Sequence, residues 1–302
     1  MSAGDAEQWV NLFFSQHPPS WINIAHVNEG GFEPFHTDRK WILWKQVTTD
    51  RRAGPDRIQV LRLAIKCNGR YVYKYVAKVF PEYTERDARA QLRRIPFKRD
   101  PRDVRDELDP FLNEARVFRR INNYCESSQR IYFPRFHGVI TDLDDSKFFS
   151  GYFNRRAVVL EFIKPELSSR RILATREPDA TERHWNFMLR LQSIVPSLST
   201  FEVEYYCSLF IDRIRRLSAL HNLAITHGDV RDDHFRLPGD FHDTVLYDFS
   251  VSYTFSSVPP YLINFRRPRS LKDISEYEQS CVEEQSNATG FSSSSYSVNW
   301  GP

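Results

Sequence analysis

The stretch from Ile214 to Ser250, IRRLSALHNLAITHGDVRDDHFRLPGDFHDTVLYDFS, contains the elements from which the fold of the whole chain is predicted. Apolar residues recur along its first part at helical spacing, which predicts a helix that ends near Asn222. A short apolar strand follows, and then a polar loop that carries Asp229. Two further short strands within 234–247, joined by a Pro-Gly-Asp turn, lead directly into Asp248. The predicted order is helix, strand, loop with an aspartate, hairpin, and a second aspartate at a strand end.

This order of elements resembles the catalytic half of the protein kinase-like fold. His-Gly-Asp at 227–229 stands where protein kinases carry His-Arg-Asp, and it is similar to the form found in the aminoglycoside and choline phosphotransferases. Asp-Phe-Ser at 248–250 resembles the Asp-Phe-Gly motif. In phosphoryl transfer one carboxylate orients and deprotonates the incoming hydroxyl, while another holds magnesium on the phosphates. The resemblance therefore implies that Asp229 is the catalytic base, that Asp248 is a metal ligand, and that Arg231 contacts the γ-phosphate.

Three upstream segments, 41–49, 58–67 and 70–80, have the β-branched and aromatic residues of strands, and an Asn-Gly turn joins the last two. They predict the small antiparallel sheet that is expected upstream of such a catalytic loop. The end of the last strand resembles the Val-Ala-Ile-Lys strand of kinases, which implies that Lys78 reaches the α- and β-phosphates. From strand alternation alone Lys78 would face solvent, and Lys74 would serve equally well.

A lysine in that role needs a glutamate on the next helix to hold its ammonium group in place. The segment 111–121 has a helical apolar stripe, and Glu114 beside that stripe resembles the glutamate of the kinase helix C. Glu107, in a more polar context, is the alternative. The charged segment 81–110 has mixed signs and lacks interleaved aromatic residues, which favours a solvated insertion over a nucleic-acid surface.

Residues 157–163 predict another strand, which resembles the strand that leads into the hinge between the kinase lobes. This resemblance implies that Leu160 lines the back of the adenine pocket. It also implies that backbone groups of Glu161 and Ile163 bind the adenine edge. A buried strand without any ligand role would explain the same pattern.

Two features depart from the kinase pattern. The family places an asparagine five residues after the catalytic aspartate to bind a second magnesium ion, and here that position is His234. Imidazole suits zinc, copper or iron better than magnesium, which prefers oxygen, so His234 is a candidate ligand at an altered second metal site. The predicted phosphate loop at 51–55 has a single glycine, which predicts weaker nucleotide binding unless its arginines compensate.

The bulk composition fits one large domain or a two-lobed one. With 302 residues, 41% of them hydrophobic, the chain is long enough to bury a sizeable core. A net charge of +3 is too small to indicate a nucleic-acid partner. The four cysteines lie far apart, which predicts neither a zinc site nor a disulfide framework. The sequence contains no long apolar run and no signal peptide, so a cytoplasmic or nuclear protein without a membrane span is expected.

Together these observations predict an α+β chain with a bilobal protein kinase-like fold, in which a small antiparallel N-lobe sheet faces a mainly helical, truncated C-lobe. The expected parts are an N-terminal helix and extension (1–20), the N-lobe (21–163), the partial C-lobe (164–285) and a disordered serine-rich tail (286–302). The expected function is transfer of the γ-phosphate of ATP, with Mg²⁺ or Mn²⁺, to a hydroxyl of a protein serine or threonine. A pseudokinase that acts as a binding scaffold and a small-molecule kinase of the aminoglycoside or choline type are the alternatives.

Overall fold

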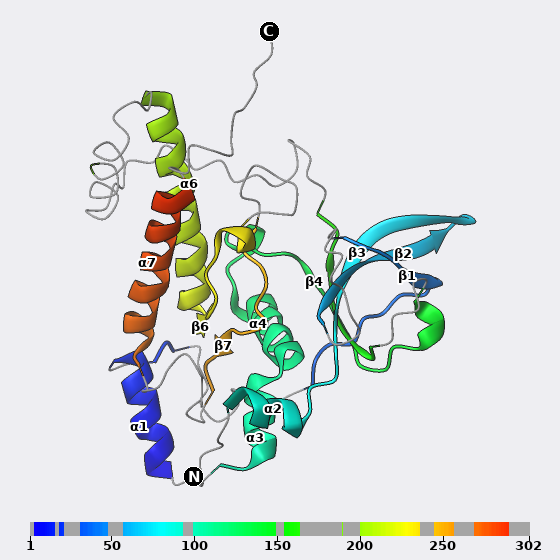
Figure 1. Cartoon of the computed structure of the whole chain (residues 1–302), viewed down its shortest axis with the longest axis horizontal. Coiled ribbons are helices and arrows are strands. Elements are labelled where there is room, and N and C mark those ends of the chain that lie inside the picture. The colour runs from blue at the N-terminus through cyan, green and yellow to red at the C-terminus, as the bar shows by residue number, and fades with distance from the viewer. Residues whose placement is uncertain are drawn as a thin grey trace.

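The protein is described here by a computed structural model, and its architecture is mixed α+β. Figure 1 shows an antiparallel sheet on one side, the helices α1, α6 and α7 on the other, and α4 between them. The structure describes residues 3–15, 18–20, 31–47, 57–92, 99–148, 154–163, 189, 200–235, 245–256 and 269–289. The elements in chain order are α1 (Ala3–Phe14), β1 (Trp41–Gln46), β2 (Gln59–Cys67), β3 (Arg70–Phe80), α2 (Glu85–Leu92), α3 (Pro101–Leu108), α4 (Pro110–Tyr124), η1 (Arg130–Tyr132), β4 (Phe136–Ile140), η2 (Asp145–Lys147), β5 (Arg156–Glu161), α6 (Thr200–Asn222), β6 (Ile225–Thr226), η3 (Asp232–His234), β7 (Tyr253–Thr254) and α7 (Leu271–Thr289).

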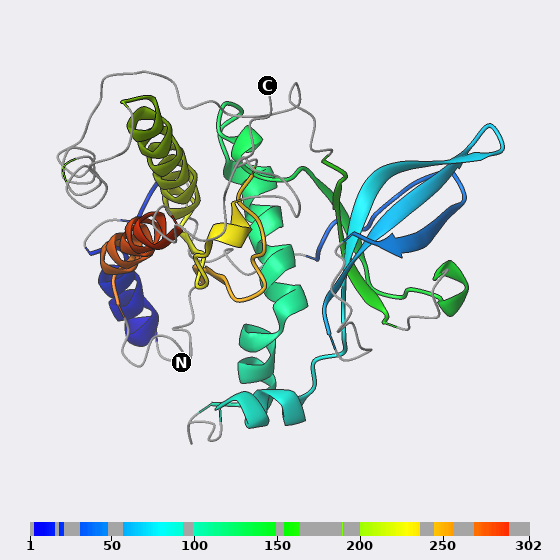
Figure 2. The same cartoon turned by 45° about the horizontal axis from the view of Figure 1, so that its top comes forward.

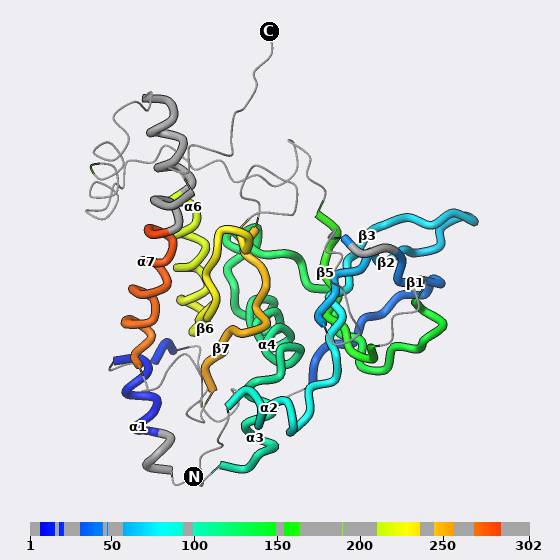
Figure 3. The backbone as a smooth tube through the Cα atoms, viewed as in Figure 1, coloured from blue at the N-terminus to red at the C-terminus, as the bar shows by residue number. Residues whose placement is uncertain are grey.

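The sheet has five strands in the order β1-β2-β3-β5-β4, and every neighbouring pair is antiparallel. Figure 3 shows β5 lying beside β3 and β4. The predicted hairpin turn between β2 and β3 is present, with φ of 49° at Asn68 and 78° at Gly69. Positive φ at both central residues is the signature of the type I′ turn, whose twist matches that of the flanking strands.

Helix α4 lies between the sheet and the other helices, as Figures 1 and 2 both show. Its first turn is capped by Asp109, whose carboxylate accepts a hydrogen bond of 3.0 Å from the amide of Phe111. The helical stripe predicted for this segment is buried in one core cluster, together with residues of β5 and α6. The residues of that stripe are Phe111, Ala115, Phe118 and Ile121.

The described parts of the charged segment before α4 are folded. They form two short helices, α2 and α3, which bury a small apolar cluster made by Ala88, Val104 and Leu108. Asp109 then forms an ion pair with Arg156 of β5, which ties the end of the segment to the sheet. The predicted solvated insertion is thus a small helical unit, because its few apolar residues are spaced so that they meet across two helices.

The predicted hairpin strands between residues 234 and 247 are not regular strands. Residues 232–234 form the 3₁₀ turn η3, and 245–248 are irregular, although the Tyr247 amide donates to the His234 carbonyl over 3.1 Å. The regular pairing in this region is instead between β6 and β7. Residues 236–244 lie outside the described residues.

Helix α1 packs against the β6–β7 pair and α7 through Trp9, Val10 and Phe13, which are buried with Tyr253 and Phe255. Leu12 of the same helix is 43% exposed and so lies outside this cluster. Helix α7 extends to residue 289, so the predicted boundary at 286 falls inside a helix. None of the described helices is long and apolar enough to cross a membrane.

Gly138 in β4 has a backbone conformation that a side chain would oppose. Its φ is +112°, and a Cβ atom there would lie 2.7 Å from the amide nitrogen of Phe35. The segment that contains Phe35 is hydrogen-bonded to β4 on both sides of Val139, with 2.8 Å from the Phe35 amide to the Val139 carbonyl and 2.8 Å from the Val139 amide to the Glu33 carbonyl. The missing side chain therefore lets this segment extend the sheet at its β4 edge.

We expect Gly138→Ala to lower the free energy of unfolding by roughly 3–4 kcal/mol, because it adds overpacking against a backbone to the strain of positive φ. Gly69→Ala is the matched control, since Gly69 also has positive φ but a Cβ there would meet nothing within 4 Å. That substitution should cost about 1–2 kcal/mol. Urea denaturation of both variants measures the two losses, and equal losses would contradict the steric account.

Candidate functional site

Three elements bring one buried ammonium group and two carboxylates together. The Nζ of Lys78, on β3, lies 2.8 Å from Oε2 of Glu114 on α4 and 2.6 Å from Oδ1 of Asp248. The structure thus unites the predicted lysine, its predicted glutamate partner and the predicted metal ligand. Glu107, the alternative partner, forms an ion pair with Arg99 instead. Lys74 is exposed, while Lys78 is buried, so the two lysines of β3 are not equivalent.

The two carboxylates of this cluster differ in how readily they ionise. Burial disfavours the charged form of Lys78, but the carboxylates of Asp248 and Glu114 outweigh burial and raise its pKa. Burial raises the pKa of Glu114 to about 7, and Lys78 only partly offsets this effect. For Asp248 burial is outweighed by Lys78, so its pKa is held below its ordinary value. Asp248 is therefore the carboxylate that stays ionised, and Glu114 is the one that takes up a proton first.

The segment that carries Asp248 is fixed by its neighbours. Asp248 has φ of 66°, the left-handed region that aspartate tolerates better than most residues. The Ser250 hydroxyl donates to Asp248 Oδ1 over 2.8 Å, and the Ser250 carbonyl accepts from Asn113 of α4 over 3.3 Å. Between them Phe249 is fully buried, with its ring centroid 5.3 Å from that of Phe118. The serine that replaces the glycine of the motif thus helps to aim the carboxylate.

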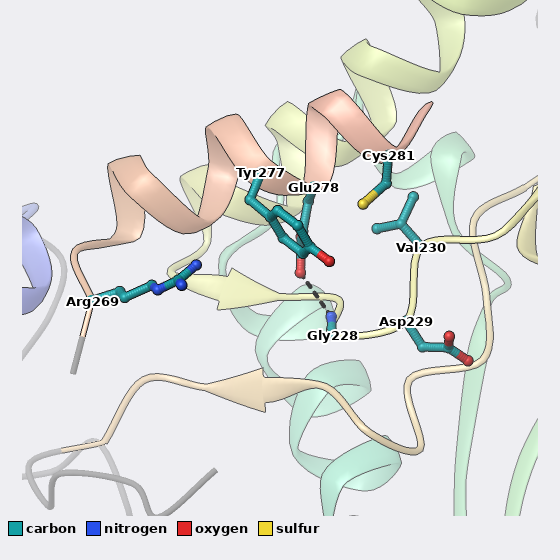
Figure 4. A pocket seen from close by; sticks show the side chains of 7 residues that line it. All are labelled: Gly228, Asp229, Val230, Arg269, Tyr277, Glu278 and Cys281. Atoms are coloured by element: carbon teal, nitrogen blue, oxygen red, sulfur yellow. Dashed lines mark hydrogen bonds between the residues drawn. The ribbon is translucent and has the colours of Figure 1, made fainter. Parts of the chain in front are cut away.

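The backbone at position 228 requires glycine, which accounts for the glycine of the His-Gly-Asp sequence. The φ of Gly228 is +79°, and a Cβ atom there would lie 2.5 Å from the carbonyl oxygen of Val251. Its amide donates to Oε1 of Glu278 over 2.7 Å, and the amide of His227 donates to Oε2 of the same glutamate over 3.1 Å. His221 on α6 lies 2.7 Å from that Oε2 through its Nε2. One buried carboxylate from α7 therefore fixes the backbone of the loop (Figure 4).

Glu278 is the main functional residue that the sequence interpretation missed. It lies between Ile274 and Val282 at helical spacing, and all three residues are buried. A charged residue at the centre of an apolar stripe is a signal that it has a buried partner, because an unpaired buried charge is costly. Helix α7 thus supports the loop through Glu278.

The imidazole of His227 is buried behind the loop and is neutral. Its Nε2 donates to the Tyr247 carbonyl over 3.2 Å, and its Nδ1 accepts from the Asp229 amide over 3.4 Å. Since a carbonyl only accepts and an amide only donates, these two contacts fix the tautomer. Burial lowers the pKa of His227 to about 4. The ring thus links the segment before Asp248 to the backbone of Asp229.

Asp229 and Asp248 converge on His234. The Nε2 of His234 lies 3.9 Å from Oδ2 of Asp229 and 3.5 Å from Oδ2 of Asp248. Its Nδ1 donates to the Asp229 carbonyl over 2.6 Å, since a carbonyl only accepts. Arg231 donates to that Nε2 over 3.0 Å and to Oδ2 of Asp229 over 2.8 Å. The α6 residue Arg213 anchors the same loop through a 2.6 Å ion pair with Asp232.

These contacts limit what the site offers to a metal ion. Among the described residues no three His, Cys, Asp or Glu side chains are grouped to hold a metal by themselves. Asp248 is ionised and supplies a hard oxygen ligand, which suits magnesium when substrate phosphates provide the other ligands. The lone pair of His234 Nε2, by contrast, accepts a hydrogen bond from Arg231. The residues thus fit one magnesium ion at Asp248 and do not fit a second at His234.

The predicted adenine-binding residues lie at the end of β5. Val158 pairs with Lys78 and Leu160 pairs with Val76, so Leu160 is on the same sheet face as Lys78. Leu160 is buried in the main core cluster. The Glu161 amide donates to the Arg135 carbonyl over 2.9 Å, so this amide is engaged within the chain. Ile163 is half-buried, and the predicted phosphate loop at 51–55 lies outside the described residues.

A cavity of about 390 Å³ lies on the α7 side of the loop. Figure 4 shows that the Asp229 carboxylate points away from Tyr277 and Cys281 and so does not face this cavity. The lining residues are Gly228, Asp229, Val230, Arg269, Tyr277, Glu278 and Cys281.

Comparison with models of known protein families gave no match, and comparison with the sequences of curated proteins gave none either.

His227 makes the stability of this site dependent on pH. Its pKa is about 4 in the folded chain and about 6.5 in the unfolded chain, so between these values only the unfolded chain binds the proton. The free energy of unfolding should therefore fall as the pH is lowered through this window, by about 3 kcal/mol in total. His227→Asn lacks this contribution, and the stabilising effect of Glu114 protonation is common to both chains.

Urea denaturation at several pH values between 7.5 and 4 checks this prediction. The stability difference between the unmodified chain and His227→Asn should shrink as the pH falls. A difference that stays constant would show that His227 is not held neutral by burial.

Proposed function

We propose that this chain is an ATP-dependent phosphotransferase of the protein kinase-like superfamily, which transfers the γ-phosphate to a hydroxyl of a protein serine or threonine. The observation that carries this proposal is the convergence of Lys78, Glu114 and Asp248 beside the loop that bears Asp229. A phosphotransferase site needs a cation for the phosphates, a carboxylate for the metal and a second carboxylate for the hydroxyl. These groups come from separate elements and meet in one place.

The arrangement of the elements supports a bilobal reading of the fold. The five-stranded sheet with α4 corresponds to the proposed N-lobe, and α6, β6, β7 and α7 correspond to the proposed C-lobe. Lys78 belongs to the sheet, whereas Asp229 lies on the loop after β6. Under this proposal the nucleotide binds between the two, with its adenine against Leu160 and the backbone of Glu161 and Ile163.

Each side chain then has a defined task. Lys78, held by Glu114, binds the α- and β-phosphates as a fixed cation. Arg231, already placed beside Asp229, contacts the γ-phosphate. Asp229 is half-exposed, and its carboxylate orients the acceptor hydroxyl and takes its proton. Asp248 would hold Mg²⁺, which when bound neutralises charge on the phosphates.

A pseudokinase is the second candidate, and a specific observation favours it. Arg231 bridges Asp229 and the Nε2 of His234, so the presumed base and the altered metal position are joined by one guanidinium group. If this bridge persists when a nucleotide binds, Asp229 stays paired and turnover is slow or absent. In that case the chain binds nucleotide as a scaffold.

Nucleotide binding tests the proposal first. A ligand that binds only the folded state stabilises it, by about 2.7 kcal/mol at one hundred times Kd. We therefore expect ATP with Mg²⁺ or Mn²⁺ to raise Tm by several degrees in a thermal shift assay. Asp248→Ala should abolish the rise, whereas alanine at Asp233, an exposed residue of the loop that bears Asp229, should keep it.

A phosphoryl-transfer assay then separates the two candidates. Asp229→Asn should retain the thermal shift and lose phosphate transfer if the chain is an enzyme. No shift with millimolar nucleotide and either metal would remove ATP binding from the proposal. A shift without measurable transfer in the unmodified chain would leave the scaffold.

The second metal position is tested by His234→Asn, which replaces an imidazole nitrogen by an amide that offers an oxygen ligand. With a non-hydrolysable ATP analogue we expect the unmodified chain to bind one Mn²⁺ and the variant to bind two. With ATP itself the variant should transfer phosphate several-fold faster. Electron paramagnetic resonance counts the bound Mn²⁺. His137→Asn on β4 is the control, and two ions in the unmodified chain would refute the single-metal site.

A further inference from the structure

Helix α4 carries Glu114, so the position of this helix decides whether Lys78 keeps its partner. We propose that Arg120, six residues further along α4, is a positioning residue that fastens the helix to the β6–β7 region and so holds Glu114 opposite Lys78. The fastening itself is independent of the proposed function, and only its consequence for nucleotide binding rests on that function.

The guanidinium group of Arg120 contacts three backbone carbonyls from two segments of the chain. Its Nη2 donates to the Phe255 carbonyl over 2.7 Å, and its Nη1 lies 3.4 Å from the carbonyls of Leu223 and Ala224. Leu223 and Ala224 stand between α6 and β6, and Phe255 follows β7. One side chain of α4 therefore grips both strands of the β6–β7 pair at the same end.

The acceptors of Arg120 are held in place. Ala224 has φ of 54°, and its carbonyl also accepts from the Phe255 amide over 2.9 Å. The side chain of Phe255 is fully buried between Trp9 and Phe13 of α1. The carbonyls that Arg120 contacts thus belong to a rigid corner of the chain. Hydrogen bonds to fixed acceptors can hold α4 in one position.

A buried arginine at this position lowers stability unless its hydrogen bonds compensate for the loss of hydration. Arg120 is 7% exposed, and burial lowers its pKa to about 10, so it is still charged at neutral pH. Burying a charge carries a desolvation penalty of several kcal/mol, and an apolar side chain would fill the same space without that penalty. The directional hydrogen bonds are what the arginine adds, because apolar packing does not fix the orientation of a helix.

The two contacts of α4 together prevent its rotation. Glu114 and Arg120 are six residues apart, which places them about 9 Å apart along the axis and about 120° apart around it. Glu114 is bonded to Lys78 of the sheet, while Arg120 is bonded to the β6–β7 corner. Between them Phe118 packs against Phe249, the residue after Asp248. A helix fixed on two sides cannot turn Glu114 away from Lys78 without breaking the Arg120 contacts.

The test compares Arg120→Met, which keeps the length and loses the donors, with Arg120→Lys, which keeps one charged donor group. Arg119→Met is the matched control, because Arg119 is the neighbouring residue and its guanidinium lies over the Phe32 ring instead. Amide hydrogen exchange is measured along α4 and β1–β2, and the Kd of ATP with Mg²⁺ is measured by titration.

For Arg120→Met we expect exchange in α4 to rise at least tenfold while β1–β2 is unchanged, and Kd to rise about tenfold. Arg120→Lys should show a smaller change in both, and Arg119→Met should behave like the unmodified chain. A uniform rise in exchange that follows the loss of global stability would show a merely structural residue and overturn the proposal. Unchanged exchange in α4 would overturn it as well.

A double-substitution cycle measures the coupling between Glu114 and Arg120 in ATP binding. A purely structural role of Arg120 would not produce such a coupling. Glu114→Gln and Arg120→Lys should each weaken ATP binding, and together they should weaken it by less than the product of their separate effects, because both act on one helix position. Multiplicative effects would refute the coupling. If Arg120→Met does not fold, the lysine variant carries both measurements. If the unmodified chain binds no ATP, the proposed function fails and hydrogen exchange alone decides the role of Arg120.

Discussion

A single buried ammonium group shared by two carboxylates is the constraint on which the rest of the site depends. Lys78 meets Glu114, 36 residues away, and Asp248, 170 residues away. Two carboxylates brought together without a cation would repel each other, and a buried lysine without them would be neutralised by desolvation. Strand β3, helix α4 and the segment after Tyr247 must therefore be in place together, so the centre of the molecule forms cooperatively or not at all.

The two loops beside this centre, which carry Asp229 and Asp248, have backbone conformations that specific contacts fix. Gly228 has no room for a side chain, and its amide is held by Glu278. Asp248 has positive φ, and Ser250 and Phe249 fix the chain behind it. A carboxylate that is aimed by its own backbone needs little reorganisation when a ligand arrives. This is the property that electrostatic catalysis requires of its charged groups.

The sequence predicted those parts of the site that follow a local pattern. Lys78 and Glu114 stand in segments that resemble the lysine strand and the helix C of kinases, and the resemblance suggested them, since strand alternation alone would have placed Lys78 in solvent. Glu278 and Arg120 were not predicted, because their partners are backbone amides and carbonyls from distant segments. Such atoms are present at every residue and carry no sequence signal. Of the hairpin predicted after His234 only the two ends are described, and there the 3₁₀ turn η3 and an irregular segment stand where strands were predicted, joined by the hydrogen bond from the Tyr247 amide to the His234 carbonyl.

The charge balance of the site also bears on how it would treat a nucleotide. Two cations, Lys78 and Arg231, face three carboxylates, Glu114, Asp229 and Asp248. A triphosphate adds several negative charges to a place that is already deficient in positive charge. Under the proposed function the divalent ion is therefore a condition of binding and not only of chemistry.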